Sequence, residues 1–353
     1  MTSSFPLCFR AGPGARRHIE RHGLDPQRIS AIAGAAGGPK WLVLAGMDKL
    51  LFGKWLRERR EPLPLVGASI GSWRFAAAAQ RDVQAAFDRL EQLYVEQTYS
   101  DKPSYRDVTT TAIKLVKELL GPGGARDILE HTWARLHIVT ARCKGWSGLD
   151  ATLPMVAGFG AATLVNTVNR RALSLMLERQ VFADPRPGKL PATVFPGFAT
   201  RLPALTEANL PSALLASGSI PFVMEAVAIE GQAGRYRDGG MVDYHMDLPL
   251  GRDGLVLMPH FSRRIVPGWL DKFVPWRKPR YLNNTLVIHP SDEWIASLPN
   301  GKIPDRKDFQ RYRGEDAARF RDWRMAAERS GELAECLAER LEKQDIEAFL
   351  QPL

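Results

Sequence analysis

Cysteine is scarce in this chain of 353 residues. The three present, Cys8, Cys143 and Cys336, lie far apart and form no C-x-x-C pair. Such a sparse, odd set excludes a framework of disulfide bonds and is typical of proteins from a reducing compartment. No spacing of histidine, cysteine and aspartate typical of a metal site is present either, so we expect neither a metal ion nor a cofactor.

A long hydrophobic run is also lacking. The longest apolar stretch, Leu153–Val165, is interrupted by glycine and is too short to span a bilayer. The first ten residues show no charged segment followed by an apolar one, which predicts that no secretory leader is present. We therefore expect a cytoplasmic protein, whose contact with a membrane, if it has one, is peripheral.

The charge of the chain is not concentrated in the manner of a nucleic-acid-binding module. The net charge is +9, spread along the chain with local basic clusters in residues 57–60 and 263–280. A diffuse positive excess favours anionic partners, lipid headgroups among them. Because no helix-turn-helix, zinc-finger spacing or basic stripe with interleaved aromatic residues occurs, we expect no nucleic-acid partner. The oligomeric state stays open.

What the chain does contain is an alternation of short apolar runs with helical segments. β-rich runs are expected at Ile29–Ala33, Leu63–Val66, Leu136–Ala141, Thr193–Phe195, Gly254–Met258 and Asn284–His289. Helices are expected at Trp41–Trp55, Val83–Val95, Val108–Leu120, Val165–Arg179, Leu210–Gly218 and Ala317–Leu350. This alternation predicts an α/β sandwich with a mainly parallel central sheet. Without a convincing linker we expect one domain, residues 1–353, with its main motifs in 29–250 and further strands and C-terminal helices in 251–353.

The most informative motif is Gly67-Ala68-Ser69-Ile70-Gly71. It stands between an apolar, strand-like run and a helix-like run. A sharp strand-to-helix turn needs small residues on both sides, and such a turn presents the serine hydroxyl to a substrate. The motif G-x-S-x-G therefore predicts a nucleophile at Ser69, although a tight turn that merely opens a helix would show the same residues.

A second glycine-rich turn, Gly34-Ala35-Ala36-Gly37-Gly38-Pro39-Lys40, follows the first expected strand. Backbone N–H groups at the start of a helix can hold an anion. The glycine spacing fits no nucleotide-binding motif, since Lys40 is followed by Trp41. The alternatives are an oxyanion hole, with donors at Gly37 and Gly38 but not at Pro39, and a turn that serves only close packing.

A serine nucleophile needs a base, and the chain offers histidine and aspartate. His289 ends an apolar run and fits the last place of a Ser–Asp–His order, and His245 lies in a polar segment. Both positions are also consistent with structural histidines. Asp238, followed by Gly239 and Gly240, marks a tight turn in which the carboxylate could face a cleft or close an ordinary Asx turn.

Four blocks in chain order resemble the patatin-like phospholipases. They are the Gly37–Lys40 turn, Gly67–Gly71, Ala216-Ser217-Gly218-Ser219-Ile220-Pro221, and Asp238-Gly239-Gly240. Together they cover roughly residues 29–250 and are far more specific than any one alone. The resemblance implies a three-layer α/β/α fold and a Ser–Asp dyad, without histidine, that hydrolyses acyl esters of lipids.

Carried over by position, the resemblance implies a role for each matching residue. Ser69 becomes the nucleophile and Asp238 the general base. Gly37 and Gly38 supply the oxyanion hole, and the supporting residues are Lys40, Gly67, Gly71, Gly239 and Gly240. The substrate becomes a lipid or another acyl ester, with no cofactor or metal required.

The chain departs from the family pattern at Ala36, at bulky Trp41 and after Gly240, where Met241-Val242-Asp243 replaces an asparagine–proline continuation. These departures identify a divergent, bacterial-type member and question the oxyanion geometry. Two alternatives therefore stand beside the dyad. One is an α/β-hydrolase-type esterase with a triad of Ser69, an aspartate and His289, and the other is a binding or scaffold protein that keeps the fold.

A lipid hydrolase must also meet a lipid surface. The segment Trp269–Tyr281 mixes aromatic residues with Lys272, Arg277, Lys278 and Arg280. Aromatic and basic side chains are both favoured at an anionic bilayer surface. The segment therefore suggests peripheral membrane contact, and a partly packed surface loop is the alternative.

Overall fold

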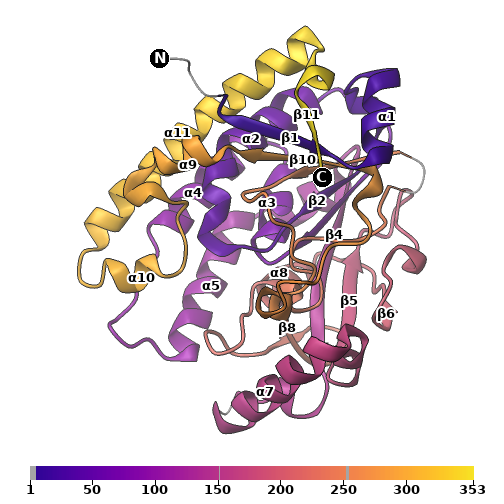
Figure 1. Ribbon diagram of the computed structural model, residues 1–353. Helices are drawn as coiled ribbons and strands as arrows, with labels where there is room; N and C mark the ends of the chain where they lie inside the picture. Colours follow the sequence, from indigo (N-terminus) through magenta and orange to yellow (C-terminus); the bar gives the residue numbers. More distant parts are fainter. Residues whose placement is uncertain (1–4, 151, 252–253) are drawn as a thin grey trace.

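The computed structural model describes residues 5–150, 152–251 and 254–353 of the chain (Figure 1). Its strands form one eleven-stranded sheet in the order β11-β1-β10-β9-β2-β3-β4-β5-β6, with β8 paired to β4 and β7 to β8. The strands are β1 Leu7–Ala11, β2 Ile29–Gly34, β3 Leu63–Ala68, β4 Ala134–Cys143, β5 Leu177–Ala183, β6 Thr200–Arg201, β7 Val227–Ile229, β8 Gln232–Asp238, β9 Leu255–Pro259, β10 Thr285–Pro290 and β11 Leu350–Pro352.

The centre of this sheet is parallel. Neighbouring strands from β10 through β9, β2 and β3 to β4 all run in the same direction, whereas β1, β5 and β8 join antiparallel. Every residue of β3 is buried, as expected for a parallel strand covered on both faces. The carboxyl ends of parallel strands meet at one edge of the sheet, and the turns after β2 and β3 lie there.

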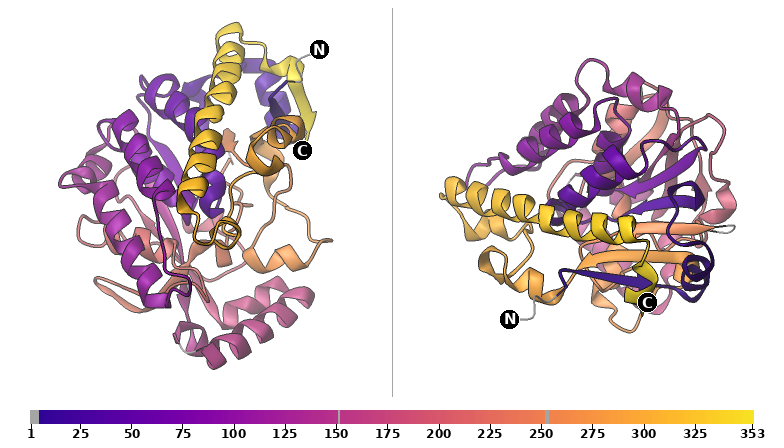
Figure 2. Two further views of the ribbon diagram at one scale, coloured as in Figure 1. Left: turned by 90° about the vertical axis from the view of Figure 1, so that its left-hand side faces the viewer. Right: turned by 90° about the horizontal axis from the view of Figure 1, so that it is seen from above.

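The helices are α1 Pro13–His22, α2 Ala45–Leu50, α3 Ile70–Ala78, α4 Val83–Val95, α5 Tyr105–Leu120, α6 Gly124–Glu130, α7 Thr152–Val168, α8 Leu210–Ser217, α9 Asp292–Ala296, α10 Asp308–Arg311 and α11 Asp316–Lys343. Helix α3 packs on β2, β3 and β4, and the long α11 packs on α2 and α4 (Figures 1 and 2). The predicted α/β fold with a mostly parallel central sheet flanked by helices is confirmed. The division of the chain into domains stays a prediction.

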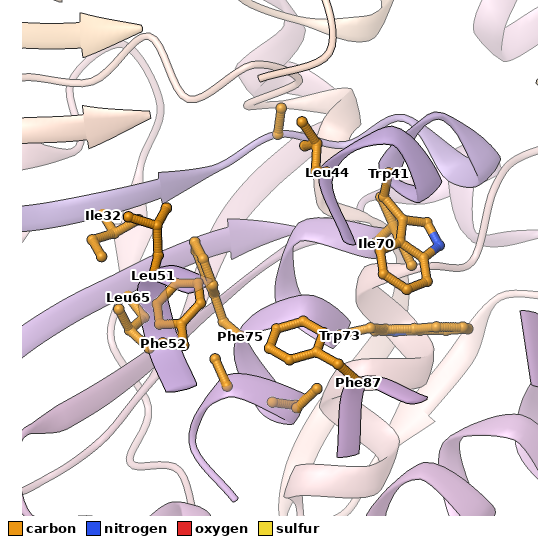
Figure 3. Close-up of a cluster of buried hydrophobic side chains, with 14 of the residues drawn as sticks. Ile32, Trp41, Leu44, Leu51, Phe52, Leu65, Ile70, Trp73, Phe75 and Phe87 are labelled. Atoms are coloured by element: carbon orange, nitrogen blue, oxygen red, sulfur yellow. The ribbon is translucent and has the colours of Figure 1, made fainter. Parts of the chain in front are cut away.

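Two hydrophobic clusters form the core, one on each face of the sheet. The larger holds the inward faces of α2–α5 and α11 together with Ile32 and Leu65, and part of it is drawn in Figure 3. The smaller contains Ala33, Val66 and Val139 and is covered by α7 and by irregular segments around Val242 and Ile265. Alternate residues of β2 and β3 thus face opposite clusters, which is the period of an extended chain.

Three of the local predictions are wrong. Ala317–Leu350 is not one helix, because α11 ends at Lys343, Gln344 adopts a left-handed conformation, and Leu350 begins β11. Thr193–Phe195 is not a strand, because Ala192–Val194 forms a 3₁₀ turn. Val165–Arg179 is not one helix either: α7 ends at Val168, a 3₁₀ turn spans Arg170–Leu175, and β5 begins at Leu177. The side chain of Asn169 accepts a hydrogen bond from the Arg171 N–H, which starts the new turn. The segment Trp41–Trp55 is helical as predicted, in three parts of 3₁₀, α and π geometry.

Within the described ranges, none of the helices is both long and apolar enough to cross a membrane. The apolar stretch Leu153–Val165 forms most of α7. The prediction about a secretory leader concerns a segment whose residues 1–4 lie outside the described ranges.

Candidate active site

Ser69 occupies the turn between β3 and α3. Its backbone has φ 55° and ψ −130°, a conformation that costs an L-residue of this kind on the order of 1–3 kcal/mol and is held only by its surroundings. A Cβ on Gly71 would collide with the carbonyl oxygen of Gly34, and one on Gly67 would lie 2.6 Å from the Gly71 carbonyl carbon. The two glycines therefore allow α3 to approach β2 and β3 closely enough to hold this turn.

Hydroxyl groups beneath the turn hold its backbone in place. The Ser69 N–H donates to Ser217 Oγ at 2.9 Å, and the Ser217 hydroxyl donates to the Val139 carbonyl at 2.7 Å. Ser72 Oγ donates to the Gly67 carbonyl at 2.8 Å and lies 3.0 Å from Ser217 Oγ. Because the Ser69 N–H is engaged in this network, it is not free to bind a substrate oxygen.

The hydroxyl of Ser69 donates a 2.7 Å hydrogen bond to Asp238 Oδ2. Asp238 ends β8, and its second oxygen, Oδ1, accepts the Gly240 N–H at 2.7 Å. Burial raises the pKa of the Asp238 carboxyl, opposed by the charge of Arg306 and by these two hydrogen bonds. Ser69 and Asp238 are both buried, with 3% and 6% of their surface exposed.

The turn after Asp238 is packed as tightly as the one around Ser69. A Cβ on Gly239 would collide with the Val139 carbonyl oxygen, and one on Gly240 would lie 2.9 Å from the Ala36 methyl group. Ala36 thus packs directly on the aspartate turn, with its N–H donating to the Tyr244 carbonyl at 2.8 Å. The residue that departs from the family pattern here is part of the support of Asp238.

The glycine-rich turn after β2 lies at the same edge of the sheet. Gly38 has φ 59°, and a Cβ on Gly37 would lie 2.5 Å from the Phe261 ring. Neither glycine amide donates to a protein acceptor within residues 5–150, 152–251 and 254–353. Trp41 does not obstruct the site, because its side chain is fully buried in the larger hydrophobic cluster (Figure 3).

Two cavities meet at Ser69. The first, of about 260 Å³, carries positive side chains and is called here the cationic cavity; its lining includes Gly37, Lys40, Ser69, Asp238, Lys272 and Arg306. The second, of about 400 Å³, is called the apolar cavity; its lining includes Ile70, Trp73, Val108, Val223, Met224 and Phe309. Ser69, Ile220 and Arg306 line both, whereas Asp238 lines only the cationic cavity.

The candidate histidines lie elsewhere. His289 is in β10, three strand positions from β3 in the sheet, and its Nδ1 lies 2.9 Å from the Pro290 carbonyl oxygen. His245 is buried beside His260, and its Nδ1 accepts the Val266 N–H. Burial lowers the pKa of both His245 and His289, and neither lines the cationic or the apolar cavity. In the described part of the chain, no group of three or more His, Cys, Asp or Glu residues could hold a metal ion.

A family model described as patatin-like phospholipase matches residues 35–245, more than half of the chain. The chain belongs to the patatin-like phospholipase family. The match spans Ser69, Asp238 and the glycine turn, and membership suggests a lipid acyl hydrolase. A comparison with curated proteins gives no match.

Sequence reasoning missed several residues of this patatin-like site. Ser72 is a fully buried hydroxyl in an otherwise mostly apolar helix, and that contrast was a usable signal. Arg306 had none, because it stands on an irregular segment where a single cation has no local signature. Lys272 was noted only as a basic residue of the segment expected at a membrane, and it lines the cationic cavity instead. Trp269, expected at a membrane, is half-buried and lines the cationic cavity.

Proposed function

We propose that this chain is a serine acyl hydrolase of the lipase or phospholipase type, which cleaves carboxylic esters of lipids through Ser69 and Asp238. The hydrogen bond of 2.7 Å between Ser69 Oγ and Asp238 Oδ2, at the junction of two cavities, carries the proposal. A nucleophile and its base must lie within hydrogen-bond reach, and these two side chains do.

In the acylation step, Asp238 accepts the Ser69 proton as Oγ attacks the ester carbonyl carbon. The free amides of Gly37 and Gly38 are the candidate donors to the oxyanion that develops. Asp238 then gives its proton to the departing alcohol oxygen as the C–O bond breaks. A buried carboxyl with a raised pKa is a stronger base than an exposed one, which suits this task.

In the deacylation step, a water molecule attacks the acyl-enzyme carbonyl and gives a proton to Asp238. The same amides stabilise the second oxyanion. Asp238 returns the proton to Ser69 Oγ as the acid product leaves. Each proton taken by Asp238 is thus given back within one cycle, so the dyad needs no further base.

The test is hydrolysis of short p-nitrophenyl esters and of phospholipids by wild type, Ser69→Ala and Asp238→Asn. We expect kcat to fall at least about 10³-fold in both variants, because nucleophile and base act as a unit. His289→Asn is the matched control, since its amide can replace the ring Nδ1 at Pro290. Equal activity of wild type and Asp238→Asn would contradict the dyad.

Each alternative predicts a different result. The triad esterase requires His289→Asn to lose activity as completely as Ser69→Ala. The scaffold protein requires that folded wild type neither hydrolyses any ester nor reacts with a fluorophosphonate. The dyad requires activity and labelling in wild type and in His289→Asn.

We also propose that the enzyme meets anionic lipid surfaces peripherally through the segment Trp269–Tyr281 and α7. Phe273 and Trp276 are 63% and 68% exposed, and Leu164 and Val168 of α7 are 72% and 90% exposed. Such apolar side chains next to basic residues favour an anionic interface.

Polar contacts tie α7 to this segment. Asn166 of α7 donates to Asp271 Oδ1 at 2.8 Å, and Arg277 pairs with the same carboxylate at 2.5 Å and with Asn166 Oδ1 at 2.9 Å. These groups fix the two elements to each other, so the exposed apolar residues stand on two elements that are joined by polar contacts.

Co-sedimentation with phosphatidylglycerol vesicles tests the membrane proposal. Trp276→Ala and Leu164→Ser are expected to weaken binding several-fold, since each removes apolar area that a membrane would bury. Met325→Ser is the control, because Met325 is an exposed apolar residue of α11, which packs on α2 and α4 (Figure 1). Binding unchanged by Trp276→Ala and Leu164→Ser would contradict the proposal.

A further inference from the structure

Several backbone donors around the nucleophile are already engaged with protein acceptors. The N–H groups of Ser69 and Ala36 donate to protein oxygens at 2.9 Å and 2.8 Å, and Pro39 has no N–H. The amides of Gly37 and Gly38 stay available for an oxyanion, but an amide is a neutral donor. A cation beside this turn would add a charge-assisted contact that the amides cannot supply.

Arg306 places its guanidinium group against this glycine turn. A Cβ on Gly38 would lie 3.1 Å from Arg306 Nε and 3.3 Å from Nη2. Arg306 belongs to the segment between the 3₁₀ turn Pro299–Gly301 and α10, outside the matched residues 35–245. It lines both the cationic and the apolar cavity, as Ser69 does. The guanidinium therefore stands where the two cavities meet at the nucleophile.

Three further cations of the site differ from Arg306 in position. Lys40, Lys272 and Lys307 line the cationic cavity but not the apolar one. Lys40 and Lys272 each lie over an aromatic ring, 5.2 Å and 3.9 Å from its centroid. Lys307 follows Arg306 in the chain and is exposed. Among these four cations, the contact with Gly38 and the place in both cavities single out Arg306.

The charge of Arg306 is not neutralised by the protein. In the part of the chain that the structure describes, its guanidinium forms neither an ion pair nor a hydrogen bond. The adjacent carboxylate of Asp305 pairs with Lys302 at 3.4 Å instead. By contrast, Arg74 of α3 has a bidentate partner in buried Asp48, with both hydrogen bonds at 2.7 Å. Arg306 thus keeps its N–H donors for an atom of the substrate.

The segment that carries Arg306 is held in place by Asp308. This buried carboxylate accepts the Lys302 ammonium at 2.6 Å through Oδ1. Its Oδ2 accepts the Asp305 N–H at 2.9 Å and the indole N–H of Trp323, in α11, at 3.0 Å. Because these bonds fix the chain on both sides of Arg306, its backbone is already in place when charge develops on a substrate. Electrostatic stabilisation of a transition state depends on such preorganisation.

The movement of charge during acylation decides what this cation contributes. As Ser69 Oγ bonds to the ester carbon, its proton passes to Asp238 and the π electrons of the carbonyl move to its oxygen. Negative charge thus leaves Asp238 and appears on the substrate. The charge of Arg306 reaches Asp238, since it lowers the pKa of that carboxyl, but the two do not form an ion pair. Arg306 therefore stabilises the transition state wherever it attracts the oxyanion more strongly than the carboxylate.

We propose that Arg306 is a further catalytic residue, whose guanidinium stabilises the oxyanion together with the Gly37 and Gly38 amides. This assignment rests on the proposed acyl hydrolase function and adds to it a residue from outside the matched family segment. Arg306 gives up no proton: the electron pair returns from the oxygen to the carbon as the alcohol leaves. Because the contact is with the ester carbonyl, it acts on neutral substrates as well as on charged ones.

The test is hydrolysis of a neutral ester, p-nitrophenyl butyrate, at a pH above the acid limb of each variant. We expect Arg306→Gln to lower kcat about 10- to 100-fold, less than the loss of a buried oxyanion donor, because Arg306 is exposed. Arg306→Lys keeps the charge and should lose less. Since the side chain has no hydrogen-bond partner to lose, we expect both variants to fold.

Two further variants separate a contact at the turn from the general field of the site. Arg313→Gln is the matched control, because Arg313 pairs with Asp101 at 3.6 Å and lines only the apolar cavity. Its kcat should stay at the wild-type value. Lys307→Gln removes a neighbouring charge of the cationic cavity and should lower kcat less than Arg306→Gln. An equal loss in Lys307→Gln and Arg306→Gln would overturn the specific role of Arg306.

A pair of ketone inhibitors reports on the oxyanion itself. Ser69 Oγ adds to the carbonyl carbon of a short trifluoromethyl ketone, Asp238 takes the proton, and the ketone oxygen becomes an alkoxide. Its inhibition constant should rise in Arg306→Gln by about the factor by which kcat/KM falls. The methyl ketone of the same chain length stays an uncharged carbonyl, and its inhibition constant should not change. A merely structural role would move both constants together, and that result would overturn the proposal.

Failure of the two proposals can be told apart. Wild type that hydrolyses the ester, with kcat unchanged in Arg306→Gln, would overturn the role of Arg306 and leave the hydrolase standing. Wild type that neither hydrolyses the ester nor reacts with a fluorophosphonate would remove the hydrolase and the role of Arg306 with it.

Discussion

Two parts of the candidate site, called here its floor and its wall, differ in how the surrounding protein holds their residues. The floor, made of the Ser69 and Asp238 turns, lies inside the matched family segment, is buried, and has backbone atoms where a Cβ on Gly67, Gly71 or Gly239 would go. The wall, carrying Lys272 and Arg306, lies beyond that segment, and these two side chains have no acidic partner in the described residues. Close packing thus holds Ser69 and Asp238, whereas Lys272 and Arg306 line the same cavity without such packing or an acidic partner.

The largest effect expected from this contrast is on folding. Gly239→Ala places a methyl group against the Val139 carbonyl oxygen, and we expect a loss of about 3 kcal/mol or more in unfolding free energy. Gly331→Ala in α11 meets open space and is expected to gain about 0.5–1 kcal/mol from helix propensity. Urea unfolding measures the unfolding free energy of both variants. A Gly239→Ala variant as stable as wild type would contradict the account of the tightly packed floor.

The strained backbone of the floor predicts a separation of stability from activity. Ser69→Gly and Ser69→Ala both remove the nucleophile, so we expect each to lower ester hydrolysis at least about 10³-fold. Glycine tolerates φ 55° where alanine does not, so Ser69→Gly should exceed Ser69→Ala in unfolding free energy by about 1 kcal/mol. Chemical denaturation at one pH decides this, and equal stabilities would show that the turn stores no strain.

A smaller effect couples the wall to the floor. Asp238 faces the charges of Arg306 and Lys272 as well as Ser69 and Gly240, and Arg306 lowers its pKa. Since catalysis needs the carboxylate, activity falls as the pH drops through that pKa. Arg306→Gln removes the opposing charge and should move the acid limb of kcat/KM for a neutral ester to higher pH. Arg313→Gln is the control, and its acid limb should stay at the wild-type pH. An unshifted acid limb in Arg306→Gln would show that Arg306 does not act on Asp238.

The smallest expected effect concerns the stability cost of Asp238. Burial raises its pKa in the folded state, so its favourable contribution is present below the unfolded pKa and lost as pH rises through the folded pKa. Asp238→Asn does not ionise, and its Tm relative to wild type should therefore rise between about pH 4 and about pH 7. Calorimetry at the two pH values checks the sign, and a relative Tm that falls would contradict it.

The floor could be predicted from sequence because its requirements are local. The glycines around Ser69 and after Asp238 are needed where the backbone turns, so they leave a fixed pattern along the chain. The structure brings Ser69 and Asp238 into one hydrogen bond as expected, and their catalytic roles stay predictions. The strands β2, β3 and β4 were predictable for a related reason, since each is a short buried run between turn residues.

The wall could not be predicted, because its residues meet only through tertiary packing. Lys272 and Arg306 are far from Ser69 in sequence, and neither belongs to a motif. The false strand at Thr193–Phe195 has a similar origin: three residues of strand propensity form a 3₁₀ turn when no neighbouring strand pairs with them. Trp41 was wrongly suspected of disturbing the oxyanion geometry. Its bulky side chain is fully buried in the core, which its position in the sequence did not reveal.

The most direct test of the Ser69–Asp238 dyad is intact-mass and peptide mass spectrometry after treatment with a fluorophosphonate. Wild type is expected to gain a single adduct on the peptide that contains Ser69. Asp238→Asn should react far more slowly, and His289→Asn at the wild-type rate. An unmodified wild type, an adduct on another residue, or equal labelling of Asp238→Asn would contradict the dyad.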